Sequence, residues 1–204
     1  MIEHFFEALP GPDWFNARDI YAEAVGSAAS GAVFVELGAW KGRSTAFMAV
    51  EIANSGKQIE FYAIDLWLGS PGEPQHRSDP DVLNGTPHET FLRNLEGARD
   101  YVVPMRCDSV EAAARFEDDS VDFLFADTEH NFDQVAAELA VWWPKIKHGG
   151  TVAGDDWNAE ETSGRLGVRD AVHGFCRAHG QRLFLRPGNP DRDYYQWQFR
   201  KERG

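Results

Sequence analysis

The segment "VFVELGAWKGRSTAFM", residues 33–48, gives the strongest structural signal in this chain of 204 residues. It opens with an apolar run, reaches Glu36, Gly38 and Gly42, and continues with the pattern of an amphipathic helix. A strand, a glycine turn and a helix in this order are typical of α/β folds, where ligands bind beyond the carboxyl ends of the strands. The glycine spacing is GxxxG, which differs from the GxGxxG fingerprint of dinucleotide-binding turns.

The alternation of strands and helices continues along the rest of the chain. We expect strands at 32–37, 59–67, 101–107, 121–127 and 149–156, and helices at 14–27, 43–56, 88–98, 109–116, 131–146 and 167–180. Two closing strands, 181–187 and 193–201, have no helix between them, so one of them must run antiparallel. The pattern predicts an α/β fold with a Rossmann-like, doubly wound, mostly parallel sheet of seven strands and an antiparallel last strand. We assign residues 1–30 to an N-terminal helical arm and 31–204 to the main domain.

Composition excludes several classes of protein. The chain carries 33 acidic and 20 basic residues, a net charge of −13, which disfavours binding to nucleic acid. Its two cysteines, Cys107 and Cys176, form no CxxC pair, as is typical of a reducing compartment. There is neither an apolar run long enough to span a membrane nor a signal-peptide pattern at the start, so we expect a soluble, cytoplasmic protein without a membrane partner.

Residues 68–87, "LGSPGEPQHRSDPDVLNGTP", form a long excursion between the second strand and the next helix. The segment contains four prolines, so its pattern predicts neither a strand nor a continuous helix. Long connections of this kind are usually functional lids or disordered loops. We predict that it covers the acceptor side of a site at the sheet edge and is mobile when no ligand is bound.

Acids lie at the carboxyl ends of five successive predicted strands, at Glu36, Asp65, Asp108, Asp127 and the pair Asp155–Asp156. Since parallel strands end at one edge of the sheet, these acids indicate a shared site. A carboxylate such as Asp65 can accept from both hydroxyls of a ribose, although it could also cap the next segment. Asp108 and Ser109 could face an adenine amino group, but alone they are better explained as an ordinary helix cap.

Together these residues resemble the class I S-adenosylmethionine-dependent methyltransferases. The resemblance is closest to a small bacterial family whose motifs appear here as "FVELGAWKGRSTAFMAVEI", "DSVEAA", "DTEH" and "WWPKIKHGGTVAGDDW", over roughly residues 14–180. The resemblance implies that Gly38 underlies the methionine part of the cofactor and that Asp65 binds its ribose. It also implies that Glu36 and Ser44 hold the amino acid end, while Asp108 and Ser109 face the adenine.

The second half of the sequence indicates the chemistry of the reaction. Asp127, Asp155 and Asp156 follow strands that are neighbours in this fold, and carboxylates suit a hard cation such as Mg²⁺, Mn²⁺ or Ca²⁺. The spacing resembles that of metal-dependent O-methyltransferases, including those that act on macrolide sugars. Without a metal, the Asp155–Asp156 pair would be a solvated turn and Asp127 a cofactor contact. His130, three residues after Asp127, is our candidate for the general base.

We therefore expect a methyltransferase that transfers a methyl group to a hydroxyl of a small polyhydroxylated acceptor, such as a sugar, a catechol or a natural product. A metal-dependent hydrolase would use the same acids at the fourth and fifth strands, but it would not need Asp65 and Asp108. A non-catalytic cofactor-binding module is a third interpretation, and a nicotinamide oxidoreductase is disfavoured by the glycine spacing. The N-terminal arm could also pack on a second copy in a homo-oligomer.

Overall fold

A sheet of seven strands organises the computed structural model, which describes residues 1–70, 72–161, 163–187 and 195–202. The strand order is β3-β2-β1-β4-β5-β7-β6, and β7 runs antiparallel to both of its neighbours while the others run parallel to one another. The strands are β1 (Ala32–Leu37), β2 (Ile59–Asp65), β3 (Val103–Arg106), β4 (Val121–Ala126), β5 (Ile146–Gly154), β6 (Phe184–Pro187) and β7 (Tyr195–Arg200). The predicted Rossmann-like sheet with an antiparallel last strand is confirmed.

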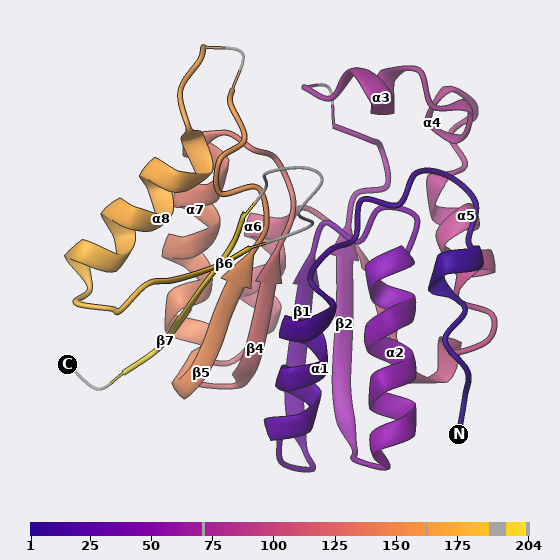
Figure 1. Ribbon diagram of the computed structural model, residues 1–204, viewed down its shortest axis with the longest axis horizontal. Coiled ribbons are helices and arrows are strands. Elements are labelled where there is room, and N and C mark those ends of the chain that lie inside the picture. Colours follow the sequence, from indigo (N-terminus) through magenta and orange to yellow (C-terminus); the bar gives the residue numbers. More distant parts are fainter. Residues whose placement is uncertain (71, 162, 188–194, 203–204) are drawn as a thin grey trace.

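Helices cover both faces of this sheet (Figure 1). One face is covered by α1 (Arg18–Ser27), α2 (Arg43–Ser55) and α5 (Pro87–Asn94), and the other by α6 (Ser109–Ala112), α7 (Phe132–Trp142) and α8 (Gly167–Ala178). Short 3₁₀ turns add η1 (Phe6–Ala8), η2 (Arg99–Tyr101), η3 (Ala113–Arg115) and η4 (Trp143–Lys145). Because helices cover both faces, β1 at the centre is buried along nearly its whole length and is apolar at all but one position.

The boundaries of several elements differ from the prediction. The first helix begins at Arg18, not at residue 14. β2 ends at Asp65 because the chain turns there, with Trp67 in a left-handed conformation (φ 53°). β5 starts at Ile146, before the expected glycine turn, and its pairing with β4 is irregular at that point. Of the last predicted strand, residues 193–194 lie outside the described residues.

The excursion at 68–87 contains two helices of about one turn, α3 (Pro74–Arg77) and α4 (Pro80–Asn84). In each, a proline occupies the first turn, where its missing N–H costs nothing. The Asp79 carboxylate caps α4 by accepting from the backbone of Asp81 and Val82. In its described residues the segment has neither a strand nor a continuous helix, as predicted, but its prolines start short helices that the sequence analysis did not predict. Figure 1 shows α3 and α4 above the carboxyl ends of the strands.

The first 30 residues pack against the sheet and against α2. Tyr21 of α1 and Phe6 of η1 are buried in the same core cluster as Phe34 of β1. The Arg43 guanidinium, at the start of α2, donates hydrogen bonds to the carbonyl oxygens of Phe6 and Leu9, among others. Within the described part of the chain, no helix has both the length and the apolar character needed to cross a membrane.

Candidate functional site

The glycine turn after β1 is held by close contacts. Gly38 has a positive φ of 87°, and a Cβ there would lie 1.9 Å from the carbonyl oxygen of Asp127. Gly42 also has a positive φ, 84°, and a Cβ there would lie 3.0 Å from the Phe91 ring of α5. Gly38 is therefore required for the contact between the turn and the end of β4. The space beside Gly42 is filled by a protein side chain, so packing explains this second glycine.

A cavity of about 210 Å³ lies at the carboxyl ends of β1, β2, β3 and β4. It brings together five residues that the sequence predicted for the site, namely Gly38, Asp65, Asp108, Ser109 and Asp127. The other side of the cavity is formed by the excursion, through Leu68, Gly69, Ser70 and His76. Small-molecule sites usually measure about 300–1,000 Å³, so this cavity fits part of a nucleoside cofactor in the present position of the excursion.

Asp65 is fixed by the backbone around it. One carboxylate oxygen accepts from the N–H of Trp40 at 2.8 Å, and the other accepts from the N–H of Trp67 at 2.6 Å. Burial raises the pKa of Asp65, while these backbone donors act in the opposite direction. The carboxylate thus ties the turn after β1 to the turn after β2, and it lines the cavity between them.

Asp108 and Ser109 also have structural partners. The Asp108 carboxylate caps α6 by accepting from the N–H groups of Val110 and Glu111, as the alternative interpretation expected. The Ser109 hydroxyl donates to Glu138 at 2.6 Å. Glu138 is 1% exposed, and burial raises its pKa. This buried acid positions Ser109 at the cavity wall.

Two predicted cofactor residues, Glu36 and Ser44, do not line the cavity. The Glu36 side chain is 1% exposed and accepts hydrogen bonds from the hydroxyls of Tyr21, Thr45 and Ser44. Burial raises the pKa of Glu36, and the three hydroxyl donors partly offset this effect. The pair forms a buried polar connection between α1, β1 and the start of α2, behind the glycine turn.

At the ends of β4 and β5, three side chains converge. One atom of each of Asp127, His130 and Asp156 that could ligate a metal, a carboxylate oxygen or a ring nitrogen, lies within 4.8 Å of the other two. Asp156 has a positive φ of 58°, which turns the chain after β5 and brings its carboxylate to His130. Asp155 is not a member of this group. Its carboxylate accepts from the N–H of Asp156 and hydrogen-bonds to Asn16 of the N-terminal segment.

These acids repel one another electrostatically. Burial and then the charges of Asp156 and Asp155 raise the pKa of Asp127 well above its usual range. Burial and the charge of Asp156 raise the pKa of Asp155 to about 7. A cavity of about 10 Å³, the space of one water-sized group, is bordered by these three acids and His130. The group therefore has both the oxygen donors and the surplus negative charge that a cation would neutralise.

His130 lies between two carboxylates. Its Nε2 is 2.8 Å from Asp156, and its Nδ1 is 3.3 Å from Glu73 of the excursion. Burial alone lowers the pKa of His130. The hydrogen bond and charge of Asp156, with the charges of Asp127 and Glu73, outweigh burial and raise the pKa to about 9. The ring therefore carries a proton at neutral pH while these acids are ionised.

The excursion contacts the glycine turn at two points. His76 stacks on the Trp40 ring, with centroids 4.0 Å apart and planes 19° apart. The Lys41 ammonium lies 2.7 Å from Asp79 and 2.6 Å from Asp81, and its side chain is only 16% exposed. These contacts place this part of the excursion over the turn that follows β1.

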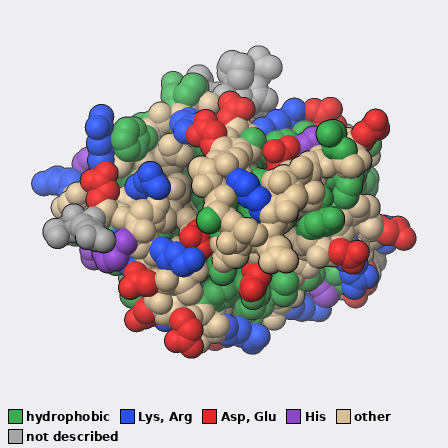
Figure 2. Space-filling view, turned by 90° about the horizontal axis from the view of Figure 1, so that it is seen from below, with side chains coloured by type: hydrophobic (Ala, Val, Ile, Leu, Met, Phe, Trp, Pro, Cys, Tyr) green, Lys and Arg blue, Asp and Glu red, His purple; other side chains and the backbone are tan. Residues whose placement is uncertain are grey.

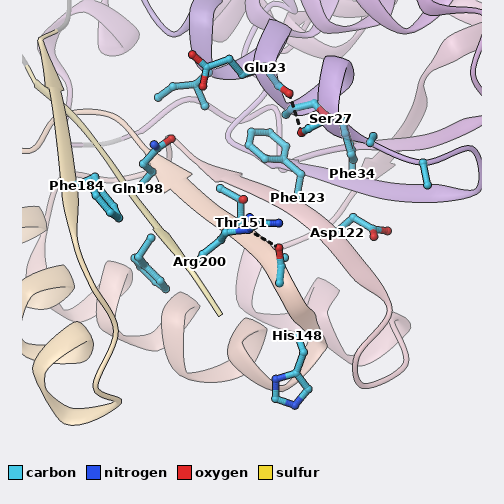
Figure 3. A pocket seen from close by; sticks show the side chains of 17 residues that line it. Glu23, Ser27, Phe34, Asp122, Phe123, His148, Thr151, Phe184, Gln198 and Arg200 are labelled. Carbon is cyan, nitrogen blue, oxygen red and sulfur yellow. Dashed lines mark hydrogen bonds between the residues drawn. The ribbon is translucent and has the colours of Figure 1, made fainter. Parts of the chain in front are cut away.

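A larger cavity, of about 400 Å³, lies elsewhere in the molecule (Figure 3). It is bordered by α1, by the β6–β7 pair and by the first residues of β1, β4 and β5, and thus opens toward the amino ends of these parallel strands. Figure 3 shows Phe123 and Thr151 lining it, with Glu23 and Arg200 nearby. In Figure 2, which looks at the molecule from below, acidic and basic side chains are scattered among each other. The site-forming acids lie at the opposite ends of the strands, so the smaller cavity is the candidate site.

The sequence interpretation missed several residues of the site. Glu138 looked like a polar residue on an amphipathic helix, and no sequence signal marks it as buried. Glu73 and Lys41 looked like ordinary surface charges, because their partners lie 57 and about 40 residues away along the chain. Such long-range pairs depend on the docked position of the excursion, which composition does not predict.

The comparisons agree with the fold. Residues 35–157 match a family model described as a methyltransferase domain. No curated protein matches the sequence. The O-methyltransferase NovP is 18% identical, with a TM-score of 0.65 over 91% of this chain and 79% of that chain. Fibrillarin from Aeropyrum pernix, solved with bound S-adenosyl-L-methionine, is 17% identical, with a TM-score of 0.57 over 90% of this chain and 76% of that chain. An S-adenosylmethionine-dependent O-methyltransferase from Thermotoga maritima is 16% identical, with a TM-score of 0.58 over 92% of this chain and 65% of that chain.

A doubly wound sheet with its candidate site at the carboxyl ends of the strands places the protein in the class I methyltransferase fold. The chain belongs to the methyltransferase-domain family, whose model covers more than half of its length, and is an S-adenosylmethionine-dependent methyltransferase.

Proposed function

We propose that the protein transfers a methyl group from S-adenosylmethionine to a hydroxyl of a small polyhydroxylated acceptor, with assistance from a divalent cation. The observation that carries this proposal is the adjacency of two different sites at one sheet edge. The cavity at Gly38 and Asp65 suits a nucleoside cofactor, and the group at Asp127, His130 and Asp156 suits a cation and a proton acceptor. Gly38 packs against the Asp127 backbone, so the two sites share a wall.

The cofactor side fits S-adenosylmethionine in its chemistry. Gly38 would lie under the methionine part, Asp65 would accept from the ribose hydroxyls, and Asp108 and Ser109 would border the adenine. Glu36 and Ser44 would act on the amino acid end from behind, by holding the start of α2. In the present position of the excursion, whose Leu68 and His76 border the cavity, the space would hold part of the cofactor.

The acidic side fits a hard divalent cation such as Mg²⁺, Mn²⁺ or Ca²⁺. Asp127 and Asp156 offer carboxylate oxygens close together, and Asp155 adds negative charge beside them. When bound, such a cation would lower the pKa of an acceptor hydroxyl and fix its orientation. The group contains no cysteine, and hard cations of this kind prefer oxygen ligands to sulfur.

The protein's own residues would then orient the acceptor and remove its proton. Methyl transfer from a sulfonium needs an in-line approach of the acceptor oxygen, so positioning supplies much of the rate. His130 would take the hydroxyl proton on Nε2, the nitrogen that faces Asp156. A histidine accepts a proton only in its neutral form, so the rate should fall at low pH as the ring becomes protonated. A cation held by Asp127 and Asp156 would lower the pKa of His130 from about 9 by neutralising the charges that raise it.

A metal-dependent hydrolase remains the second candidate, because it would use the same group of Asp127, His130 and Asp156. A hydrolase, however, would have no use for the cavity at Asp65 and Asp108. Calorimetry with S-adenosylhomocysteine separates the two functions, since the methyltransferase should bind it and the hydrolase should not.

The variant Asp65→Ala sharpens this test. Removing the carboxylate leaves the ribose hydroxyls without a hydrogen-bond partner, so S-adenosylhomocysteine should bind about 1–3 kcal/mol more weakly. Asp170→Ala, a partly exposed acid on α8 that does not line the cavity, is the matched control and should bind normally. No binding to the wild-type protein, together with binding of NAD, would contradict the proposal. A screen of sugars, catechols and other polyols with S-adenosylmethionine and Mg²⁺ would then identify the acceptor.

A further inference from the structure

The side chain of Glu73 reaches from the excursion to His130. Its carboxylate lies 3.3 Å from Nδ1, on the side of the ring away from the Nε2 contact with Asp156. The two side chains are both partly buried, with 32% and 28% of their surface exposed. Of the acids near His130, Glu73 is the one contributed by the excursion, whereas Asp127 and Asp156 belong to the ends of the sheet strands.

An imidazole held at one nitrogen can still rotate about that contact. Partners on both nitrogens fix the plane of the ring and determine which nitrogen carries a proton. The backbone around His130 is already set, because Thr128 donates to Glu138 and Phe132 donates to Glu161. The remaining freedom is in the ring itself, and Glu73 restricts it.

We infer that Glu73 is a positioning residue for His130, and that the docked excursion delivers it to the reaction site. The inference rests on the proposed function in one respect, the role of His130 as base. Nε2 can accept a proton from the acceptor only while Nδ1 carries one and Asp156 does not hold a proton on Nε2. Glu73 supplies the partner of the Nδ1 proton, and Asp156 is one of the acids that would hold the cation instead.

The position of Glu73 depends on contacts elsewhere in the excursion. Glu73 immediately precedes α3, His76 within α3 stacks on Trp40, and Lys41 pairs with Asp79 just beyond α3. Trp40 and Lys41 belong to the glycine turn on the cofactor side. The excursion therefore links the turn that would hold the cofactor to the orientation of the ring that would remove the proton.

The test compares Glu73→Ala and Glu73→Gln in the full chain, with S-adenosylhomocysteine as the probe. One-bond nitrogen–proton spectra of the imidazole N–H groups report the Nδ1–H of His130, which a His130→Asn variant assigns. We expect the Nδ1–H signal to be protected from exchange in the wild type and lost in Glu73→Ala. Glu73→Gln should restore it, because the amide oxygen still accepts a hydrogen bond.

Gln75→Ala, an exposed position on the same helix, is the control and should leave the signal unchanged. Equal thermal unfolding of all variants shows that loss of the signal does not reflect misfolding. An unchanged His130 spectrum in Glu73→Ala would overturn the inference while leaving the proposed function intact. Failure of the wild type to bind S-adenosylhomocysteine would instead overturn the proposed function, and the spectra without ligand would still decide whether Glu73 orients the ring.

Discussion

Aspartates at the two halves of the sheet edge have different surroundings. On the cofactor side, Asp65 and Asp108 accept hydrogen bonds from backbone N–H groups of the turns that follow them. At the acidic side, Asp127 and Asp156 converge and Asp155 lies nearby. Burial and then the mutual repulsion of these acids raise the pKa values of Asp127 and Asp155. The acids of the first side are paired with backbone donors, whereas those of the second side lie close to other acids. The surroundings of an acid at a strand end thus determine its pKa and its hydrogen-bond partners.

The sharpest test of this difference is His130→Ala. Loss of a general base usually lowers kcat by a factor of about 10²–10⁴. Because His130 lies on the acidic side, its removal should leave the cofactor affinity unchanged. His173→Ala, an exposed histidine on α8, is the control. Steady-state kinetics on the identified acceptor and calorimetry with S-adenosylhomocysteine measure the two quantities. Near-normal kcat in His130→Ala would remove His130 from the mechanism and favour Glu129 or an acidic phenolic acceptor.

Gly38→Ala tests the shared wall between the two sides. The new Cβ would lie 1.9 Å from the Asp127 carbonyl oxygen, and the backbone φ of 87° disfavours any side chain. We expect a loss of about 2–4 kcal/mol in the free energy of unfolding. Gly56→Ala is the matched control, because Gly56 also has a positive φ, 68°, but nothing within 4 Å of the added Cβ. Its loss should be about 1 kcal/mol by denaturant unfolding. Equal losses in both variants would contradict the close contact.

A cation should stabilise the acidic side more than the cofactor side. Mg²⁺ or Mn²⁺ at about 100 times its Kd should raise the free energy of unfolding by about 2.7 kcal/mol. Asp156→Asn should reduce this gain without changing the affinity for S-adenosylhomocysteine, whereas Asp170→Asn on α8 should retain it. Thermal unfolding with the metal and with a chelator provides the measurement. If wild-type stability and turnover are the same under both conditions, the acids have no metal role.

The same repulsion predicts how stability depends on pH without a cation. The pKa of Asp155 is about 7 in the native state, against about 3.9 in an unfolded chain. Between these values the unfolded state binds fewer protons than the native state, so stability should fall as pH rises from about 4 to about 7, by the order of 1–3 kcal/mol. His130 acts in a different range: its pKa of about 9 stabilises the fold below about 6.5, and that contribution is lost as pH rises toward 9.

Asp155→Asn isolates the lower of these two ranges. The amide resembles the protonated acid, so the decline between about pH 4 and pH 7 should become shallower, while the loss above about 6.5 should persist. Asp127, whose pKa is also raised, should account for the decline that remains. Urea unfolding in chelator across this range measures the effect. A wild-type profile that is flat up to pH 7 would show that the acids are not strongly coupled.

The fold could be predicted from local patterns, because the periods of strand and helix are written in neighbouring residues. The run 32–37, the glycine at position 38 and the helix that follows gave the first strand–turn–helix unit correctly. The absence of a helix between the last two strands gave the antiparallel strand. Most errors lie at the ends of elements, where caps and turns decide; for example, the left-handed Trp67 ends β2 two residues early. The short helices α3 and α4 of the excursion were not predicted.

The membership of the site could be predicted only in part. Parallel strands place their carboxyl ends at one edge, so the sequence alone assembles Gly38, Asp65, Asp108 and Asp127 around one cavity. It does not determine which acids face water, backbone or one another, because those surroundings come from turns and side chains far away in the chain. The structure accordingly places Glu36 behind the cavity and Asp155 beside Asn16.

The sequence by itself determined the order of the strands and helices, the glycine at the close contact and the set of acids at the sheet edge. Tertiary structure alone decided the partners of those groups: Glu138 under Ser109, Lys41 between Asp79 and Asp81, and Glu73 at His130. The physical reason is the range of the interactions. Backbone periodicity acts over a few residues, whereas a buried or paired charge depends on whichever distant segment folds against it.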